Sequence, residues 1–380
     1  MRNQADSASW TNNRLTSHLG VKYPIIQGPL GGLSSQRLTA DVSNFGGLGS
    51  FGAHGLTPEA IRQVIREIKD FTSKPFAMNL WVSMEDEEAF TSTEGAFRRS
   101  LSPLAKHIES VGGTLPSYSP YQPIRFEDQV QALLDEGISV FGFIYGIPSK
   151  QILDECRRHG IVLIGTATTV DEAIALEQAG VDVIAASGFE AGGHRGSFLK
   201  PSEDSLTGTM ALIPQVVDAV KLPVVAAGGI GDARGIVAAF ALGAEGVQMG
   251  TAFLACEESG ANAYHRKTIL GGDAKQTALT RGFTGRLARG IKNRLLDELN
   301  GQNVEILPYP LQRALMRHLS IPAEKAGRPE LLPLLAGQSA GLSNCADVQA
   351  LLDTLVGEVS EIGGAVQSWS AHRQIHIAEK

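Results

Sequence analysis

The sequence lacks several features that mark common classes of protein. Its 380 residues include only three cysteines, with no CxxC pair among them. So few cysteines exclude a disulfide-rich scaffold and indicate a reducing compartment. The N-terminal stretch MRNQADSASWTNN has no apolar segment typical of a secretory signal, and no later run of about 18 apolar residues predicts a membrane span. We therefore expect a cytoplasmic protein without membrane contact.

Positive charge and metal-binding motifs are also scarce. The formal net charge of −7 disfavours a nucleic-acid-binding protein, because such a protein needs a basic face for the phosphates. No HExxH motif and no cluster of cysteine and histidine occurs, so we expect no metal site. The phosphate-binding motif GxxxxGK[ST] is absent as well, and the acidic ribose ligand of a dinucleotide fold does not follow GGLGSFG.

Short apolar runs rich in β-branched residues alternate along the chain with amphipathic helical patterns. We predict eight strands, at residues 23–28, 47–52, 75–82, 139–144, 161–167, 181–187, 223–229 and 246–254. Alternation of strand and helix is typical of a parallel sheet. Eight such units favour an α/β fold closed into a (β/α)8 TIM barrel over an open, doubly wound sheet.

Two segments interrupt this alternation. Residues 83–138 carry an acidic helix and a stretch rich in Gly, Pro and Tyr, which we expect on the barrel rim. Residues 256–334 contain polar helices and the basic run TRGFTGRLARGIKNRLLDEL. We therefore expect residues 14–255 and 335–375 to form the barrel, and residues 256–334 to form a helical lid or substrate domain. For the basic run, the alternative is a solvated helical face that takes no part in the site.

Glycine-rich segments follow many of the predicted strands: QGPLGG (27–32), GGLGSFG (46–52), EAGGHRG (190–196), AAGGIGD (226–232) and QMGTAF (248–253). The active site of a TIM barrel lies at the carboxyl ends of its strands, so these segments come together there. Glycine lets the backbone approach a ligand closely and lets its N–H groups face an anion. The last two segments predict a phosphate site, the alternative being that their glycines only turn the chain.

Three polar residues at predicted strand ends are candidates for the chemistry. His194 follows two glycines, and it can serve as a general base or as a hydrogen-bond donor. Its neighbour Arg195 can hold an anionic substrate, pair with an acid such as Glu190, or form a surface salt bridge. Asn79, in MNLW, can offer its amide to a cofactor rather than to the core.

At these motifs the chain resembles the nitronate monooxygenases, formerly called 2-nitropropane dioxygenases, which are FMN-containing barrels. The resemblance covers residues 14–355 and includes YPIIQGP, FAMNL, PVVAAGGI, GAEGVQMGTAFL and the basic run with YPLQ and AGQ. EAGGHRG, together with the phenylalanine that follows, is similar to the first, nitronate-oxidising class of the family. The resemblance implies that O2 oxidises an alkyl nitronate, such as propionate 3-nitronate, to a carbonyl compound and nitrite.

Carried over to this sequence, the resemblance makes His194 the catalytic histidine. The implied FMN ligands are Asn79, Ser187, Gly192, Gly229, Gln248, Met249, Gly250 and Thr251, of which the last four surround the phosphate. This chain has Ser187 where many relatives have glutamine, and Leu334 or Leu335 where relatives often have an aromatic residue. We add two candidate substrate contacts, Arg195 and, from the expected lid, Tyr309.

Two further functions fit the same patterns. An FMN-dependent NAD(P)H reductase, acting on an enoyl-acyl carrier protein or a quinone, shares the GGH loop, whereas the continuation HRGSF favours the monooxygenase. A barrel that binds a sugar phosphate or a nucleotide without redox chemistry is the third. We expect a nitronate or nitroalkane and O2 as partners, no nucleic acid, and a monomer or homodimer.

Overall fold

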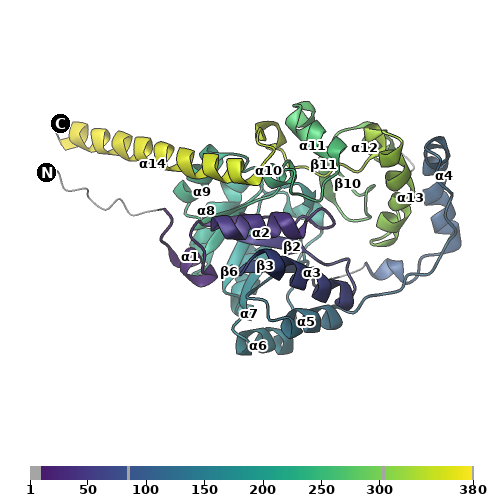
Figure 1. Ribbon diagram of the computed structural model, residues 1–380, viewed down its shortest axis with the longest axis horizontal. Helices are drawn as coiled ribbons and strands as arrows, with labels where there is room; N and C mark the ends of the chain where they lie inside the picture. Colours follow the sequence, from purple (N-terminus) through teal and green to yellow (C-terminus); the bar gives the residue numbers. More distant parts are fainter. Residues whose placement is uncertain (1–9, 84–85, 302–303, 379–380) are drawn as a thin grey trace.

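The computed structural model describes residues 10–83, 86–301 and 304–378, the last of these by backbone alone from residue 365 onward. Its centre is an eight-stranded parallel sheet in the order β1-β9-β8-β6-β5-β4-β3-β2. A parallel bridge between Ile26 and Leu48 joins the two ends of this sheet. The predicted TIM barrel is therefore confirmed, and Figure 1 shows helices packed around its strands.

The eight strands fall within the predicted ranges. They are β1 (Ile25–Gln27), β2 (Gly49–Gly52), β3 (Phe76–Trp81), β4 (Val140–Ile144), β5 (Val162–Ala167), β6 (Val183–Ser187), β8 (Val224–Ala227) and β9 (Gly246–Met249). The predicted strand 246–254 is too long, because the chain turns at Gly250 and Thr251–Leu254 forms the short helix α10. That turn places the backbone of residues 250 and 251 at the end of the barrel.

Amphipathic helices cover the outside of the barrel. They are α2 (Gln36–Phe45), α3 (Pro58–Phe71), α5 (Phe126–Asp135), α6 (Lys150–Arg158), α7 (Val170–Ala179), α8 (Thr209–Ala219), α9 (Ala233–Ala241) and α14 (Val348–Ala378). In α3 the hydroxyl of Thr57 caps the backbone N–H of Ala60, and the buried Ile61, Ile65 and Ile68 face the strands. The helix α14 lies against α9 and α2 at its start, and α1 (Arg14–Leu19) precedes β1.

The two segments that interrupt the barrel pattern pack against each other. The helix α4 (Glu94–Ser110) of the first lies beside α13 (Leu311–Lys325) of the second, at one end of the molecule in Figure 1. Together with α11 (Ala263–Leu270) and α12 (Arg294–Leu299) they enclose a second hydrophobic core, distinct from that of the barrel. The division into a barrel (14–255 and 335–375) and a lid or substrate domain (256–334) remains a prediction.

Three short strands have no counterpart in the predicted set. The strands β10 (Thr277–Thr280) and β11 (Ala288–Ile291) lie in the segment where only helices were expected. With β7 (Gly193–His194), which belongs to the loop after β6, they form an antiparallel sheet in the order β10-β11-β7. This sheet ties the inserted segment to the loop that carries His194.

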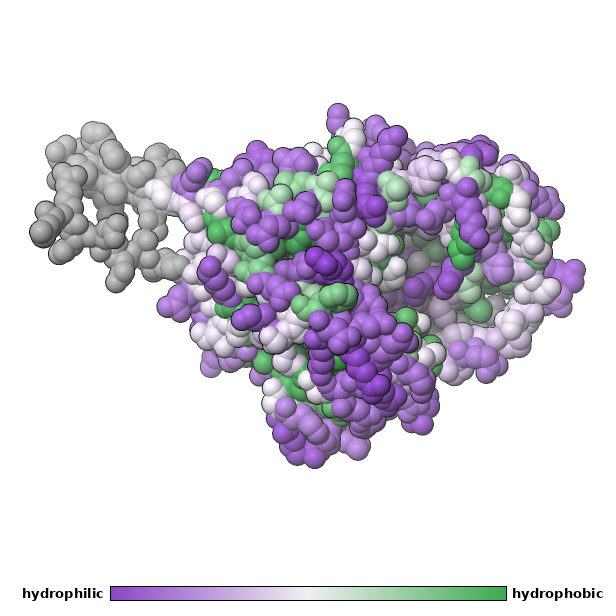
Figure 2. All heavy atoms as spheres, in the orientation of Figure 1, coloured by the Kyte–Doolittle hydropathy of each residue, from purple (hydrophilic) through white to green (hydrophobic). Residues whose placement is uncertain are grey.

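Figure 2 shows hydrophilic residues over much of the visible face, with hydrophobic ones interspersed among them. Among the described residues, no helix is both long and apolar enough to cross a bilayer.

Candidate functional site

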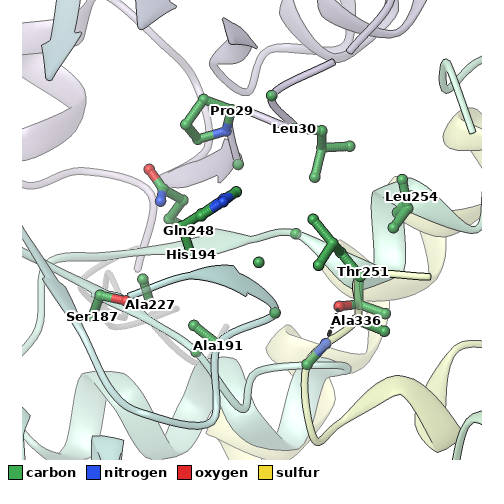
Figure 3. A pocket seen from close by; sticks show the side chains of 18 of the residues that line it. Pro29, Leu30, Ser187, Ala191, His194, Ala227, Gln248, Thr251, Leu254 and Ala336 are labelled. Atoms are coloured by element: carbon green, nitrogen blue, oxygen red, sulfur yellow. Dashed lines mark hydrogen bonds between the residues drawn. The ribbon is translucent and has the colours of Figure 1, made fainter. Parts of the chain in front are cut away.

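A cavity of about 180 Å³ lies at the carboxyl ends of the barrel strands. It is lined by residues from six strand ends and from the segment that rejoins the barrel, among them Asn79, Thr166, Ser187, Ala227, Gln248 and Gly337. Figure 3 shows Pro29 and Leu30 of the loop after β1 on one side of this cavity and Ser187 and Ala191 on the other. Four of the five glycine-rich segments thus meet at one cavity, whereas GGLGSFG (46–52) contributes no residue to the lining.

One end of the cavity is suited to an anion. Gly228 and Gly229 adopt φ values of 93° and 74°, a region that favours glycine. In the part of the chain that the structure describes, the backbone N–H groups of Gly229, Gly250 and Thr251 make no hydrogen bond to a protein acceptor. Such N–H groups, grouped at two successive strand ends, are donors for a phosphate.

The glycines of this end keep space open for a ligand. A Cβ added at Gly250 would have only Leu30 Cδ2 nearby, at 3.8 Å, so a side chain there would extend into the cavity. A Cβ at Gly192, by contrast, would lie 2.4 Å from the backbone nitrogen of Gly337. That close approach lets Gly337 N donate to Thr251 Oγ1 at 2.9 Å, the dashed line in Figure 3.

His194 lines the same cavity, and Figure 3 draws it next to Gln248. Its backbone pairs with Ala288 of β11, and its Nε2 lies 2.8 Å from Thr284 Oγ1. The ring meets Trp81 edge to face, with centroids 4.7 Å apart. Burial, and then the charges of Arg313 and Arg286, lower the pKa of His194 to about 3. The imidazole is therefore neutral at neutral pH and available for hydrogen bonding.

Aromatic rings and two cations, Arg286 and Arg313, surround His194. The guanidinium of Arg286 lies 4.3 Å from the Tyr145 ring centroid and 4.8 Å from that of Tyr309. Its Nε donates to Asp86 at 2.8 Å, which balances its charge. Tyr145 has a φ of 65°, which is unusual for a bulky residue, and it directly follows the strand β4, beside Trp81.

Most of the predicted ligands come together at the cavity. Its lining includes Asn79, Ser187, Gly192, His194, Gly229, Gln248, Gly250 and Thr251. Met249 lies beneath the lining, buried in the barrel core, and its carbonyl accepts a hydrogen bond from Gly28 N. Tyr309 is buried behind the lining, with its ring centroid 5.0 Å from that of Trp81 and 6.3 Å from that of His194.

Arg195 differs from the sequence expectations. Its side chain is 4% exposed and donates hydrogen bonds to backbone carbonyls and to a serine hydroxyl, so it forms no surface salt bridge. Glu190 instead accepts hydrogen bonds from the backbone and hydroxyl of Thr209. Burial lowers the pKa of Arg195 to about 10, which leaves it charged at neutral pH. Contact of Arg195 with substrate stays a prediction that this geometry does not support.

Several residues of the site were not found from the sequence. Trp81 lies in a predicted strand and is the last residue of β3, and its position two residues after Asn79 is the signal that could have identified it. His54 is buried, stacks on Trp81 at 3.9 Å, and has its Nε2 3.2 Å from Arg313 Nη1. For Arg313 and Thr284 no local sequence signal exists, because only the fold of the inserted segment brings them to the barrel.

Residues 337–341, GQSAG, also match the GxSxG pattern of hydrolase nucleophiles. They do not follow a strand, and Ser339 precedes a 3-10 turn (Ala340–Leu342). The strand–turn–helix context of a nucleophile elbow is missing, so the site offers no basis for an acyl-transfer mechanism. Throughout the described residues, no three His, Cys, Asp or Glu side chains gather as a metal site would require.

Comparison with known proteins agrees with this arrangement. The family described as nitronate monooxygenase matches residues 12–358. A probable nitronate monooxygenase of Staphylococcus haemolyticus is 42% identical, over 93% of this chain and 98% of its own length. The structure of nitroalkane oxidase from Streptomyces ansochromogenes is 35% identical and superposes with a TM-score of 0.83, covering 93% of this chain and 99% of that one.

A second kind of enzyme shares the fold. FabK from Thermotoga maritima is 28% identical and superposes with a TM-score of 0.73, over 94% of this chain and 99% of that one. The family match nevertheless spans nearly the whole chain, and the relative from Staphylococcus haemolyticus is well above the identity of FabK. We conclude that the chain belongs to the nitronate monooxygenase family of enzymes.

Proposed function

We propose that the protein holds one non-covalent FMN in the cavity and uses O2 to oxidise alkyl nitronates, such as propionate 3-nitronate, to a carbonyl compound and nitrite. The observation that carries the proposal is a neutral His194 in the wall of a cavity that also offers backbone N–H groups to a phosphate. Family membership supports the reaction, and the geometry supports the assignment of roles.

The residues present fit FMN. The N–H groups of Gly229, Gly250 and Thr251 suit its single phosphate, and the open space beside Gly250 suits the approach of that group. The side chains of Asn79 and Gln248 line the cavity and can hydrogen-bond the polar edge of an isoalloxazine. When bound, the flavin supplies the electron transfer between the nitronate and O2, while the protein orients the reactants.

His194 would act as a hydrogen-bonding group for the nitro function. Its orientation is set by the bond to Thr284 Oγ1 and by the edge-to-face contact with Trp81. With a pKa of about 3, the ring stays neutral throughout the working range of pH. A nitronate arrives with its α-proton already removed, so it needs a hydrogen bond from the ring; a neutral nitroalkane needs the ring as a base.

The charges around His194 favour the anionic form of the substrate. Arg286 and Arg313 both contribute positive potential at the ring, and Arg313 has no carboxylate within 4 Å among the described residues. Positive potential attracts a nitronate anion and also disfavours protonation of His194. Tyr309 Oη accepts a hydrogen bond from Arg313 at 3.3 Å and would help to hold this cation behind the substrate.

A reductase of the FabK type is the second candidate function. The overall superposition with FabK favours it. A phosphate site made of backbone N–H groups, together with a histidine, suits both nitronate oxidation and NAD(P)H-dependent reduction. The two functions differ in the electron donor, which is the nitronate in one case and NAD(P)H in the other. A cytoplasmic location and a monomer or homodimer are predictions that accompany either function.

The cofactor can be tested without any substrate. Heat or acid denaturation of the purified protein should release a yellow compound that co-elutes with FMN, at about one per chain. Release of FAD, or a flavin that stays attached to the polypeptide, would contradict the proposed cofactor. A colourless protein would favour a barrel without redox chemistry.

A further inference from the structure

A network of buried polar side chains includes Arg195, the residue that follows His194. It consists of Thr168, Glu172, Arg195, Ser197 and Ser205, each of which is at most 8% exposed. These residues come from the start of α7, from the chain after β7 and from a 3-10 turn (Ser202–Ser205). Polar groups buried in this way are costly unless their hydrogen bonds are made, so the network fixes one arrangement of these segments.

Arg195 forms the inner end of the network. Its guanidinium donates to the carbonyl oxygen of Ser187 at the end of β6 and to that of Thr168 just beyond β5, the latter at 3.1 Å. It also donates to the backbone carbonyl and, at 3.1 Å, to the hydroxyl of Ser205. The residue after His194 is thus fastened to two adjacent strand ends of the barrel.

Glu172 forms the outer end. Its carboxylate accepts hydrogen bonds from the backbone N–H groups of Phe198, at 2.6 Å, and Leu199, at 3.2 Å. It also accepts from the N–H of Thr168 at 2.7 Å and from the hydroxyl of the same residue at 2.6 Å. A carboxylate in the first turn of α7 is favoured by the helix dipole. Glu172 therefore holds the chain four residues after His194.

The backbone around His194 is held from the opposite side as well. His194 pairs with Ala288, and Arg195 N donates to Leu287 O at 2.9 Å, both within the inserted segment. The short stretch 193–199 therefore has the inserted segment on one face and the anchors Arg195 and Glu172 on the other. Neither anchor is part of the cavity lining.

We propose that Arg195 and Glu172 are positioning residues, which hold His194 at its place in the cavity by anchoring residues 194–199 and do not contact the substrate. The inference rests on the proposed function, because it is that function which gives His194 its task. Lysine cannot replace Arg195, since a single ammonium cannot reach carbonyls on two strand ends and a serine hydroxyl in the same plane.

The test uses Arg195→Lys and Glu172→Gln in the flavin-loaded protein, with the variant Arg157→Lys as a matched control. Arg157 also donates to backbone carbonyls, those of Ala179 and Gly180, but at the opposite end of the barrel strands. We expect Arg195→Lys and Glu172→Gln to lower kcat for propionate 3-nitronate about tenfold to a hundredfold, with KM within about twofold and flavin content unchanged. Arg157→Lys should match the wild type.

Two further measurements separate positioning from substrate contact. In a His194→Ala background, Arg195→Lys should cause little additional loss, because it acts through His194; losses that multiply would overturn the proposal. Hydrogen–deuterium exchange at residues 193–199 should be faster in both anchor variants than in the wild type and the control. Unchanged exchange would overturn the proposal too, and this result does not depend on the substrate. A wild type inactive on nitronates would instead refute the proposed function.

Discussion

The Nε2 atom of His194 lies 2.8 Å from the hydroxyl oxygen of Thr284, a residue 90 positions later in the chain. His194 belongs to the barrel loop after β6, and Thr284 belongs to the segment inserted between β9 and α14. The bond therefore makes the orientation of the candidate catalytic ring depend on the docking of the insertion, which a lone barrel could not provide.

Thr284→Val should weaken catalysis by removing this bond while keeping the size of the side chain. We expect kcat with a nitronate to fall roughly three- to tenfold, since a neutral hydrogen bond contributes about 0.5–1.5 kcal/mol. Thr284→Ser, which restores the hydroxyl, should recover most of the loss. Equal activity in wild type and Thr284→Val, measured by nitrite release, would show that the ring needs no such partner.

His194→Ala should retain flavin and lose activity to different extents on two forms of substrate. With neutral nitroalkanes the loss should lie near the lower end of the 10²–10⁴-fold that a general base usually contributes, because a ring with a pKa of about 3 is a weak base. With preformed nitronates it should be smaller, because their α-proton is already gone. The wild-type profile of kcat/KM for nitronate should show no ionisation of His194 between pH 5 and 8, because its pKa is about 3. Equal losses on both substrate forms would leave positioning as its only role.

Gly250→Val should exclude the cofactor. The added side chain would extend into the cavity at the end that offers N–H groups to a phosphate. We expect flavin affinity to fall at least about tenfold, since a clash or a displaced phosphate costs more than about 1.4 kcal/mol. Gly341→Ala is the control, because an added Cβ there meets no atom within 4 Å. Normal absorbance at the flavin bands in Gly250→Val would contradict this placement of the phosphate.

The stability of the protein should depend on pH through His265. Burial lowers its pKa to about 4, while its Nε2 donates to the carbonyl of Leu335 at 2.9 Å. In the unfolded chain His265 is protonated below about pH 6.5, whereas in the folded chain it is protonated only below about pH 4. The free energy of unfolding therefore falls as the pH falls between these two values. Between pH 7 and 4 the free energy of unfolding should drop by about 3 kcal/mol more in the wild type than in His265→Gln. Urea titrations with parallel pH dependence in both proteins would argue against the buried, neutral histidine.

Tyr309→Phe should affect substrate binding and not the cofactor. The change removes the hydroxyl that accepts a hydrogen bond from Arg313, behind the cavity wall. We expect the apparent KM for nitronate to rise roughly two- to tenfold, with flavin content as in the wild type. Tyr264→Phe is the control, because Tyr264 lies in the same inserted segment, whereas Tyr309 is the tyrosine that packs near Trp81 and His194. Wild-type kinetics in Tyr309→Phe would refute a role for the inserted segment at the substrate.

The barrel could be predicted from the sequence because its strands are short apolar runs between helices with regular signals. The cap at Thr57 and the buried isoleucines of α3 are examples of signals that act within one turn of the helix. The end of β9 was harder, because TAFL is apolar enough for a strand and only the turn at Gly250 starts α10.

Only those residues of the candidate site that lie at strand ends or on barrel loops could be predicted from the sequence. His194 and Thr251 follow the strands β6 and β9, and Gln248 lies near the end of β9, where local pattern and barrel geometry agree. Thr284 and Arg313 contact the lining residues His194 and His54 through long-range packing of the insertion, about which a local sequence pattern carries no information. Arg195 looked like a substrate ligand, because charge next to a candidate catalytic residue does not reveal whether the side chain turns inward or outward.

The identity of the electron donor distinguishes the proposed nitronate oxidation most directly from an NAD(P)H-dependent reduction. The purified, flavin-loaded protein should be supplied with propionate 3-nitronate in air, with nitrite release, O2 uptake and NAD(P)H oxidation followed in parallel reactions. If the protein oxidises nitronates as proposed, nitrite appears and O2 is consumed at matching rates with no NAD(P)H present. Oxidation of NAD(P)H with an enoyl or quinone acceptor, and no nitrite from the nitronate, would contradict it.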